Sequence, residues 1–157
     1  MNRDEVLNFI MSRRSIRKFT QEPVSEEDLM VILKAAMSAP SARNDKPWSY
    51  VVVQKREILD NLAEAHPYGK MLKDAPLAIA VVGEKNADYW VHDCSASTEN
   101  ILLAASGLGL GSVWLGIHPR QDRMEGVRKI LEIPENMETL SLIAIGHPKE
   151  FPPPRTQ

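Results

Sequence analysis

The stretch PLAIAVVG, residues 76–83, decides the fold class, because it consists of apolar residues and one glycine. An apolar run of this length without polar alternation is typical of a strand that other elements cover on both faces. Helical spacing of apolar residues begins soon afterwards and predicts one long helix from Asp88 to about Leu108. We expect this helix to be the central buried one, with a stripe formed by Val91, Ser95, Thr98, Ile101, Leu102, Ala105 and Leu108.

Shorter helices and strands are predicted on both sides of this pair. The expected helices cover residues 3–14, 57–65 and 123–132, with a fourth that begins after Ser25 in a capping box with Asp28 and stops before Pro40. The expected strands cover residues 48–54, 112–117 and 140–146, and the Pro-rich tail should lie extended on a surface. Helices and strands mix without strict alternation, so the predicted fold is α+β, with a mixed central sheet flanked by helices in a single domain, 1–157.

Composition narrows the classes of function. The formal net charge is -2 and the pI is about 6.1, so the whole chain exerts no attraction on nucleic acid or an anionic membrane. No apolar run approaches the ~20 residues of a membrane span, and the N-terminus lacks an apolar signal core. Cys94 is the only cysteine, which excludes an intramolecular disulfide. We expect a soluble cytoplasmic protein with neither a nucleic-acid nor a membrane partner.

Two local patterns resemble functional motifs but fail on their context. His92, Asp93 and Cys94 are neighbours on a predicted helix, where adjacent side chains point in different directions, so we predict no metal site. His92 would lie on the helix face opposite Cys94, so Cys94 is interpreted as a buried structural cysteine rather than a nucleophile. The glycines of 107–112 follow a helix and enter a strand, the reverse of a dinucleotide-binding motif, and predict a helix stop and a turn.

The segment RRSIRKF, residues 13–19, contains four cationic side chains. One interpretation is a solvated helix end, which is common for a run of charge. A nucleic-acid patch is disfavoured, because no aromatic interleaving or further basic stripe accompanies it. In an extended segment, Arg13, Ser15 and Arg17 point the same way. Two guanidiniums with a hydroxyl between them suit a phosphate and an adjoining polar ring edge, which is the second interpretation.

Four motifs carry a resemblance to a known family. RRSIRKF, SAPSARNDKPW, GLGLGSVWLGI and IGHPKEFPPPR, in this order and over essentially the whole chain, resemble the successive signatures of the nitroreductase-like flavin enzymes. The resemblance implies non-covalent FMN, with two flavin sites at the interface of a domain-entwined homodimer. It further implies that hydride passes from NAD(P)H through flavin N5 to a small-molecule electron acceptor: a nitroaromatic, a quinone or a similar compound.

The resemblance also implies roles for the cationic segment. Arg13 and Ser15 would contact the FMN phosphate, and Arg14 would lie alongside the phosphate and the ribityl chain. Arg17 would reach the pyrimidine edge of the ring near N1 and O2. Reduced flavin carries negative charge near N1, so a cation there would stabilise it and tune its potential. No catalytic residue is implied, because the cofactor carries the chemistry.

Further residues are implied by the remaining motifs. The loop that the other subunit lays against the isoalloxazine matches Pro40, Ser41, Ala42 and Asn44. The strand end whose backbone faces N5 and O4 matches Trp114, Leu115 and Gly116. Arg155 matches a basic residue closing on the phosphate, with Lys149 as a weaker candidate. Trp48 is interpreted equally well as a stacking platform or as a core aromatic.

The sequence departs from the family in two ways. The chain is short, so the excursions that often roof the active site should be reduced. The segment 66–76, HPYGKMLKDAP, matches no flavin contact clearly, and none is assigned there. Two alternatives remain: a flavin-binding or flavin-storing protein without NAD(P)H turnover, and a module that binds a phosphate ligand but no flavin.

Overall fold

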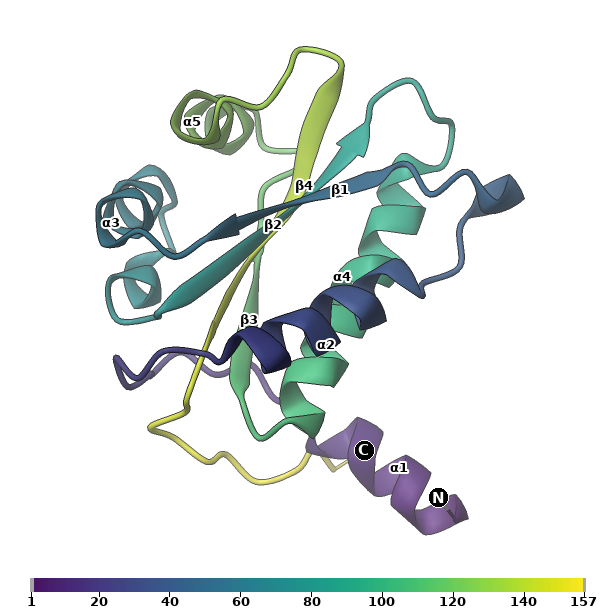
Figure 1. The fold of residues 1–157 in the computed structure, drawn as a ribbon, viewed down its shortest axis with the longest axis vertical. Coiled ribbons are helices and arrows are strands. Elements are labelled where there is room, and N and C mark those ends of the chain that lie inside the picture. The colour runs from purple at the N-terminus through teal and green to yellow at the C-terminus, as the bar shows by residue number, and fades with distance from the viewer. Residues whose placement is uncertain (1, 157) are drawn as a thin grey trace.

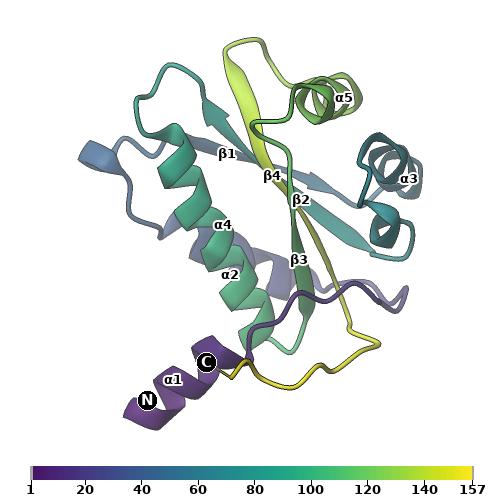
Figure 2. The same ribbon diagram turned by 180° about the vertical axis from the view of Figure 1, so that it is seen from behind.

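A four-stranded sheet separates two pairs of helices in the computed structural model, which describes residues 2–156 (Figure 1). α2 and α4 cover one face of the sheet, and α3 and α5 cover the other, as Figure 2 shows from behind. The elements in chain order are α1 (Arg3–Ser12), α2 (Glu26–Met37), η1 (Ala42–Asn44), β1 (Trp48–Val53), α3 (Arg56–Ala65), η2 (Lys70–Lys73), β2 (Leu77–Glu84), α4 (Trp90–Gly107), β3 (Gly111–Gly116), α5 (Gln121–Leu131) and β4 (Met137–Gly146).

The sheet confirms the α+β class and corrects one detail of it. Its strand order is β1-β2-β4-β3, and all three ladders are antiparallel, where the sequence predicted a mixed sheet. The apolar run of β2 arises because helices cover both faces, which gives an antiparallel strand the composition of a buried parallel one. A parallel pairing does occur outside the named strands, as the isolated bridge between Ser15 and Ser112.

Two hydrophobic cores lie on the two faces of the sheet. Along β2, Ala78 and Ala80 enter the core beneath α3 and α5, whereas Leu77 and Ile79 enter the core beneath α2 and α4. All four are fully buried. Burial of each Leu or Ile side chain contributes about 1.5–3 kcal/mol to the free energy of unfolding relative to an exposed side chain. Packing on both faces therefore stabilises the sheet.

The long helix α4 forms as expected, but its buried side is partly shifted. Thr98, Ile101, Leu102 and Ala105 of the predicted stripe are buried, whereas Val91 and Ser95 are only partly buried and Leu108 is exposed. The side chains that replace them are Trp90, Asp93, Cys94 and Ser97. The reason is that α4 packs against both α2 and the sheet, so it buries a wider sector than one stripe.

Helix α1 stands away from the rest of the protomer (Figure 1). It begins in a capping box between Asn2 and Glu5, and none of its residues is buried. Phe9 reaches the end of α4, within 3.2 Å of a Cβ placed on Gly107, while Val6, Leu7 and Ile10 are exposed. The exposed side of α1 is therefore an apolar surface that this protomer leaves uncovered.

At the start of α2, the Ser25 side chain accepts a hydrogen bond from the Asp28 N–H, which is the first half of the predicted capping box.

The C-terminal tail runs antiparallel beside residues 11–20. Three backbone bonds define this register: Thr20 N–H to His147 O at 2.9 Å, Lys149 N–H to Lys18 O at 2.8 Å, and Arg155 N–H to Met11 O at 3.2 Å. The tail thus returns to α1, as both ribbon views show. Across residues 2–156, no helix combines the length and apolar character needed to cross a membrane.

Candidate functional site

The cationic segment is fixed against the free edge of β3. Ser15 forms a parallel bridge with Ser112, and the Ile16 N–H donates to the Ser112 carbonyl at 2.9 Å. Ile16 is buried against Gly111, where an added Cβ would lie 2.7 Å from the Ile16 side chain. Because the pairing is parallel, the segment and β3 run in the same direction. Arg13 therefore lies towards the start of β3, and Arg17 towards its end.

Arg13 and Arg155 line one cavity of about 350 Å³, together with Ile10, Met11 and Thr156. The Arg13 Nε lies 3.6 Å from a carboxylate oxygen of Glu99, whose side chain is 47% exposed. The solvated carboxylate compensates only part of the positive charge of two guanidiniums, so this cavity favours an anion.

Arg17 lines a different cavity, of about 400 Å³, with Pro67, Tyr68, Lys70 and Met71. Its backbone N–H donates to a carboxylate oxygen of Glu150 at 2.7 Å. Lys70 was not assigned from the sequence, because only the folded chain brings it into the same cavity as Arg17. Arg17 and Lys70 therefore form a second positive region, separate from that of Arg13 and Arg155.

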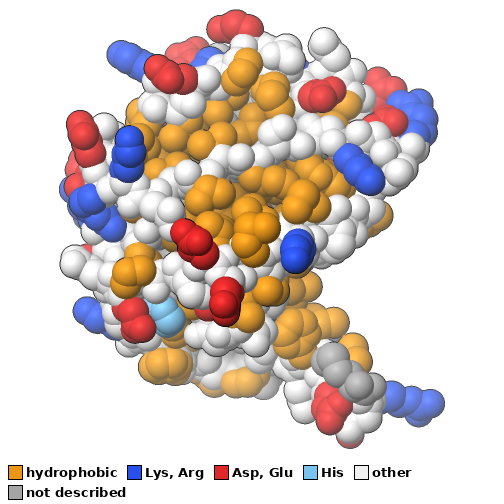
Figure 3. Space-filling model, in the orientation of Figure 1, with side chains coloured by type: hydrophobic (Ala, Val, Ile, Leu, Met, Phe, Trp, Pro, Cys, Tyr) orange, Lys and Arg blue, Asp and Glu red, His pale blue; other side chains and the backbone are white. Residues whose placement is uncertain are grey.

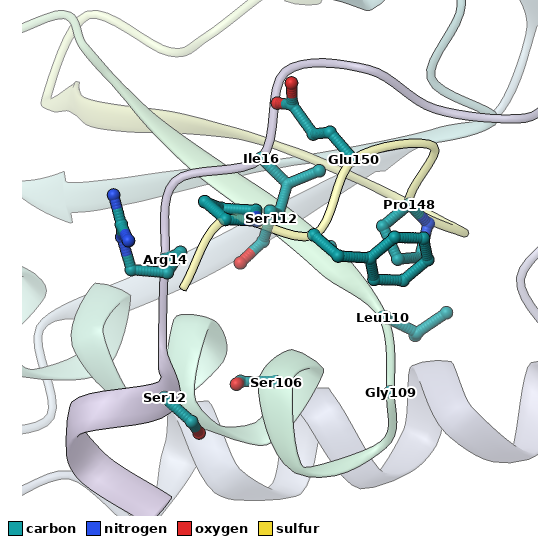
Figure 4. Close-up of a pocket in the computed structure, with 12 residues that line it drawn as sticks. Ser12, Arg14, Ile16, Ser106, Gly109, Leu110, Ser112, Pro148 and Glu150 are labelled. Atoms are coloured by element: carbon teal, nitrogen blue, oxygen red, sulfur yellow. The ribbon is translucent and has the colours of Figure 1, made fainter. Parts of the chain in front are cut away.

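Arg14 lies on the other side of the segment. It borders a cavity of about 290 Å³ with Ser12, Ser106 and Ser112, shown in Figure 4, and its Nη1 donates to the Pro153 carbonyl. Alternation along an extended segment explains the separation, because Arg14 shares its side with Ile16 rather than with Arg13. The structure therefore brings Arg13 and Arg155 together but places Arg14 and Arg17 in cavities of their own.

The end of β3 offers open backbone. The Leu115 side chain is buried in the core, and Trp114 is 37% exposed. Gly116 is partly exposed, and a Cβ built there would meet no atom within 4 Å. Its carbonyl oxygen accepts two hydrogen bonds, one from His66 Nε2 at 3.1 Å and one from Arg123 Nη1 at 2.8 Å. A flat ligand could therefore approach Gly116 without a steric obstacle.

The predicted loop residues lie far from the arginines of the same protomer. The η1 loop and the segment after α1 lie apart in both ribbon views, the loop beside the start of α4 and the segment beside its end. The Ala42 N–H donates to the buried Asp93 carboxylate at 3.1 Å, and Arg43, Asn44 and Lys46 have positive φ. Such backbone strain is retained when its surroundings fix it, and it is common at functional sites. One protomer does not bring Pro40, Ser41, Ala42 and Asn44 to the cationic cavities.

The remaining candidates are placed as follows. The backbone N–H of Lys149 donates to the Lys18 carbonyl, which places Lys149 at the end of the tail away from Arg13. Trp48 packs against the core beneath α2 and α4, which favours its core interpretation. Burial raises the pKa of the Cys94 thiol to about 12, so the thiol stays protonated near neutral pH. Among the described residues, no three His, Cys, Asp or Glu side chains gather closely enough to hold a metal.

Three cavities lined by cations therefore lie along one segment: that of Arg13 and Arg155, that of Arg14, and that of Arg17 and Lys70, with an open strand end near the last. This arrangement suits an elongated phosphorylated ligand. The chain belongs to the nitroreductase family, whose sequence profile it matches over residues 10–66 and 62–147. The family resemblance predicted from the four motifs is thereby confirmed.

Named relatives and solved structures agree with this assignment. The chain is 49% identical over 152 residues to an Archaeoglobus fulgidus protein provisionally named NADH dehydrogenase/NAD(P)H nitroreductase, covering 94% of this chain and 87% of the relative. It is 30% identical to an FMN reductase [NAD(P)H] of Bacillus subtilis, covering 94% of this chain and 67% of that protein. An FMN-dependent nitroreductase from Clostridium difficile superposes with a TM-score of 0.92 at 35% identity, covering 96% and 91% of the two chains.

Proposed function

We propose that this protein is an FMN-dependent oxidoreductase of the nitroreductase type, which takes hydride from NAD(P)H and delivers electrons to a nitroaromatic, a quinone or a similar acceptor. Family membership and the named relatives support the enzyme class and the cofactor. The structural observation that carries the proposal is the order of the cations. Arg13 and Arg155 share one cavity, and Arg17 lies further along the same segment beside Lys70.

The donor set fits FMN. The phosphate carries up to two negative charges, which two guanidiniums at one cavity match. The pyrimidine edge of the ring is polar, and Arg17 and Lys70 supply donors at the second cavity. The parallel bridge at Ser15 aligns this order with β3, so the ring end of the cofactor would lie near Gly116.

Each residue then has a defined task. FMN, when bound, supplies hydride acceptance and release at N5. Arg13 and Arg155 bind the phosphate, with Ser15 beside them, and Arg17 and Lys70 hold the ring edge. Gly116, lacking a side chain, admits the ring close to the backbone. Arg14 belongs to the adjoining cavity and reaches the tail at Pro153, so its part is to hold the tail against the site.

The functional unit in this proposal is a domain-entwined homodimer of a single domain, 1–157. The support is twofold: the η1 loop lies far from the cationic cavities of its own protomer, and α1 exposes Val6, Leu7 and Ile10. Figure 3 shows further apolar side chains on the face where α2 lies, and Met30, Val31 and Met37 of α2 are exposed. In a dimer, α1 is covered and the loop with Pro40, Ser41, Ala42 and Asn44 serves the partner's flavin. The cytoplasmic location stays a prediction.

The test combines the identity of the cofactor with turnover. The purified protein is denatured, the released chromophore is identified, and NAD(P)H oxidation is measured with and without a nitroaromatic or a quinone. We expect FMN released without covalent attachment, and oxidation that depends on an added acceptor. Absence of flavin would leave only a phosphate-binding module, and bound FMN without NAD(P)H oxidation would identify a flavin-storing protein. Comparing kcat/KM for a nitroaromatic with kcat/KM for a quinone then shows which class of acceptor the enzyme prefers.

A further inference from the structure

We propose that His66 is a positioning residue that ties the end of β3 to the segment 67–71 through its two ring nitrogens, and that this tie loosens when the ring is protonated. The inference rests on the proposed function, because these two elements are the proposed walls of the flavin ring site. His66 is 4% exposed and would not itself touch the cofactor.

The hydrogen bonds of His66 fix its protonation state. The Tyr68 N–H points at Nδ1 over 3.1 Å, so Nδ1 must accept and carries no proton. Nε2 lies 3.1 Å from the Gly116 carbonyl, so Nε2 must donate. Only the neutral ring with its proton on Nε2 satisfies both partners.

The charged groups around His66 come from α5. Arg123 donates Nη1 to the same Gly116 carbonyl at 2.8 Å, and its guanidinium lies 5.6 Å from the centroid of the Tyr68 ring. The buried Nε of Arg123 has no hydrogen-bond partner. Asp122 is the one carboxylate that acts on His66 from this helix. Burial is the main cause that lowers the pKa of His66 below its ordinary 6.5, and the like charge of Arg123 adds to it.

Protonation of His66 would change both walls. A proton on Nδ1 faces the Tyr68 N–H, so two donors meet without an acceptor. Tyr68 then loses its anchor, and Tyr68, Lys70 and Arg17 line the same cavity. Because the pKa is lowered in the folded state, the neutral ring and its tie are complete above about pH 6.5 and are lost as the pH falls through the folded pKa.

The test compares pH profiles of FMN binding for the wild type, His66→Gln and His66→Ala. A glutamine can donate to Gly116 and does not titrate. The FMN phosphate takes up a proton near pH 6 in every variant, so we expect affinity to fall there in all of them. Wild-type affinity should fall more steeply than that of His66→Gln as the pH drops below 6.5, because only the wild type also loses the His66 tie. His66→Ala should bind FMN about tenfold more weakly at neutral pH, the loss expected for one hydrogen bond. His92→Gln, at an exposed histidine, is the matched control and should follow the wild type.

A second readout does not depend on flavin binding. Imidazole nitrogen shifts of the protein as purified should show His66 as the neutral Nε2–H tautomer, titrating below pH 6.5. An Nδ1–H tautomer, or an acid transition of FMN binding equally large in the wild type and in His66→Gln, would overturn the inference and leave the proposed function intact. A protein that shows the predicted tautomer but binds no FMN would refute the proposed function instead.

Discussion

The side chains of Arg13 and Arg155 line the same cavity, although one follows the first helix and the other lies in the C-terminal tail. The backbone bond from Arg155 to Met11 holds the tail in this register. Two like charges that converge on a cavity repel each other unless an anion lies between them. This pair is therefore the strongest geometric reason to place a phosphate here.

Replacing either arginine should weaken FMN binding. Each charge-assisted hydrogen bond contributes about 1.5–3 kcal/mol, so Arg13→Ala and Arg155→Ala should each raise the dissociation constant by roughly 10- to 100-fold. Titration of FMN fluorescence measures this loss. Arg3→Ala, which removes an exposed arginine of α1, is the control and should leave affinity unchanged. Equal effects of all three variants would mean that only overall charge matters.

Arg17 should tune the cofactor more than it anchors it. A cation near N1 favours the reduced, negatively charged ring over the neutral oxidised one, so Arg17→Ala should lower the two-electron potential and cost less in oxidised-FMN affinity than Arg13→Ala. Each 30 mV of that shift corresponds to about 1.4 kcal/mol. Redox titrations of the two variants, paired with dissociation constants, make the comparison. An unchanged potential with FMN lost as readily as in Arg13→Ala would make Arg17 another phosphate ligand.

The apolar side of α1 should hold the dimer together. Leu7 is 56% exposed in the protomer, and a charge placed there would be buried in the proposed interface. Leu7→Glu should therefore shift sedimentation towards the monomer and reduce FMN retention. Asn8→Glu adds the same charge at an exposed polar position of the same helix and should stay dimeric. A wild-type monomer that retains FMN and full activity at low concentration would contradict the dimer proposal.

The contact between Gly111 and Ile16 should set the position of the cationic segment. A Cβ at Gly111 would lie 2.7 Å from Ile16, so Gly111→Ala must displace the residue between Ser15 and Arg17. We expect a loss of about 1–3 kcal/mol in the free energy of unfolding, with weaker FMN binding. At Gly126 in α5 the nearest atom to an added Cβ is 3.4 Å away, so Gly126→Ala should instead stabilise by about 0.5–1 kcal/mol. Chemical denaturation of both variants, with opposite signs expected, provides the check.

Much of the fold could be predicted from periodicity and turn chemistry. α3, β1 and β2 begin and end close to the expected residues, because continuous apolar runs mark the two strands, Pro76 marks the start of β2, and helical spacing of apolar residues marks α3. Strand direction could not be predicted, since a strand covered on both faces is equally apolar in either kind of sheet. The buried side of α4 was missed in part, because its second partner, α2, is known only once the fold is assembled.

The site residues that share a sequence motif could be predicted, whereas those that come together only through the packing of separate elements could not. Arg13 and Arg17 share a short motif, and the resemblance carried Arg155. Lys70 and His66 were missed, because their relation to Arg17 and Gly116 arises from the packing of separate elements rather than from spacing in the sequence.

The central claim is that this protein uses bound FMN to take hydride from NAD(P)H. The most direct test mixes the FMN-loaded protein with NADH or NADPH in the absence of oxygen and follows the visible absorbance of the bound flavin in a single turnover. We predict that the absorbance bleaches with one of the two donors and returns when a nitroaromatic or a quinone is added. Bound FMN that stays oxidised in the presence of both donors would contradict the account.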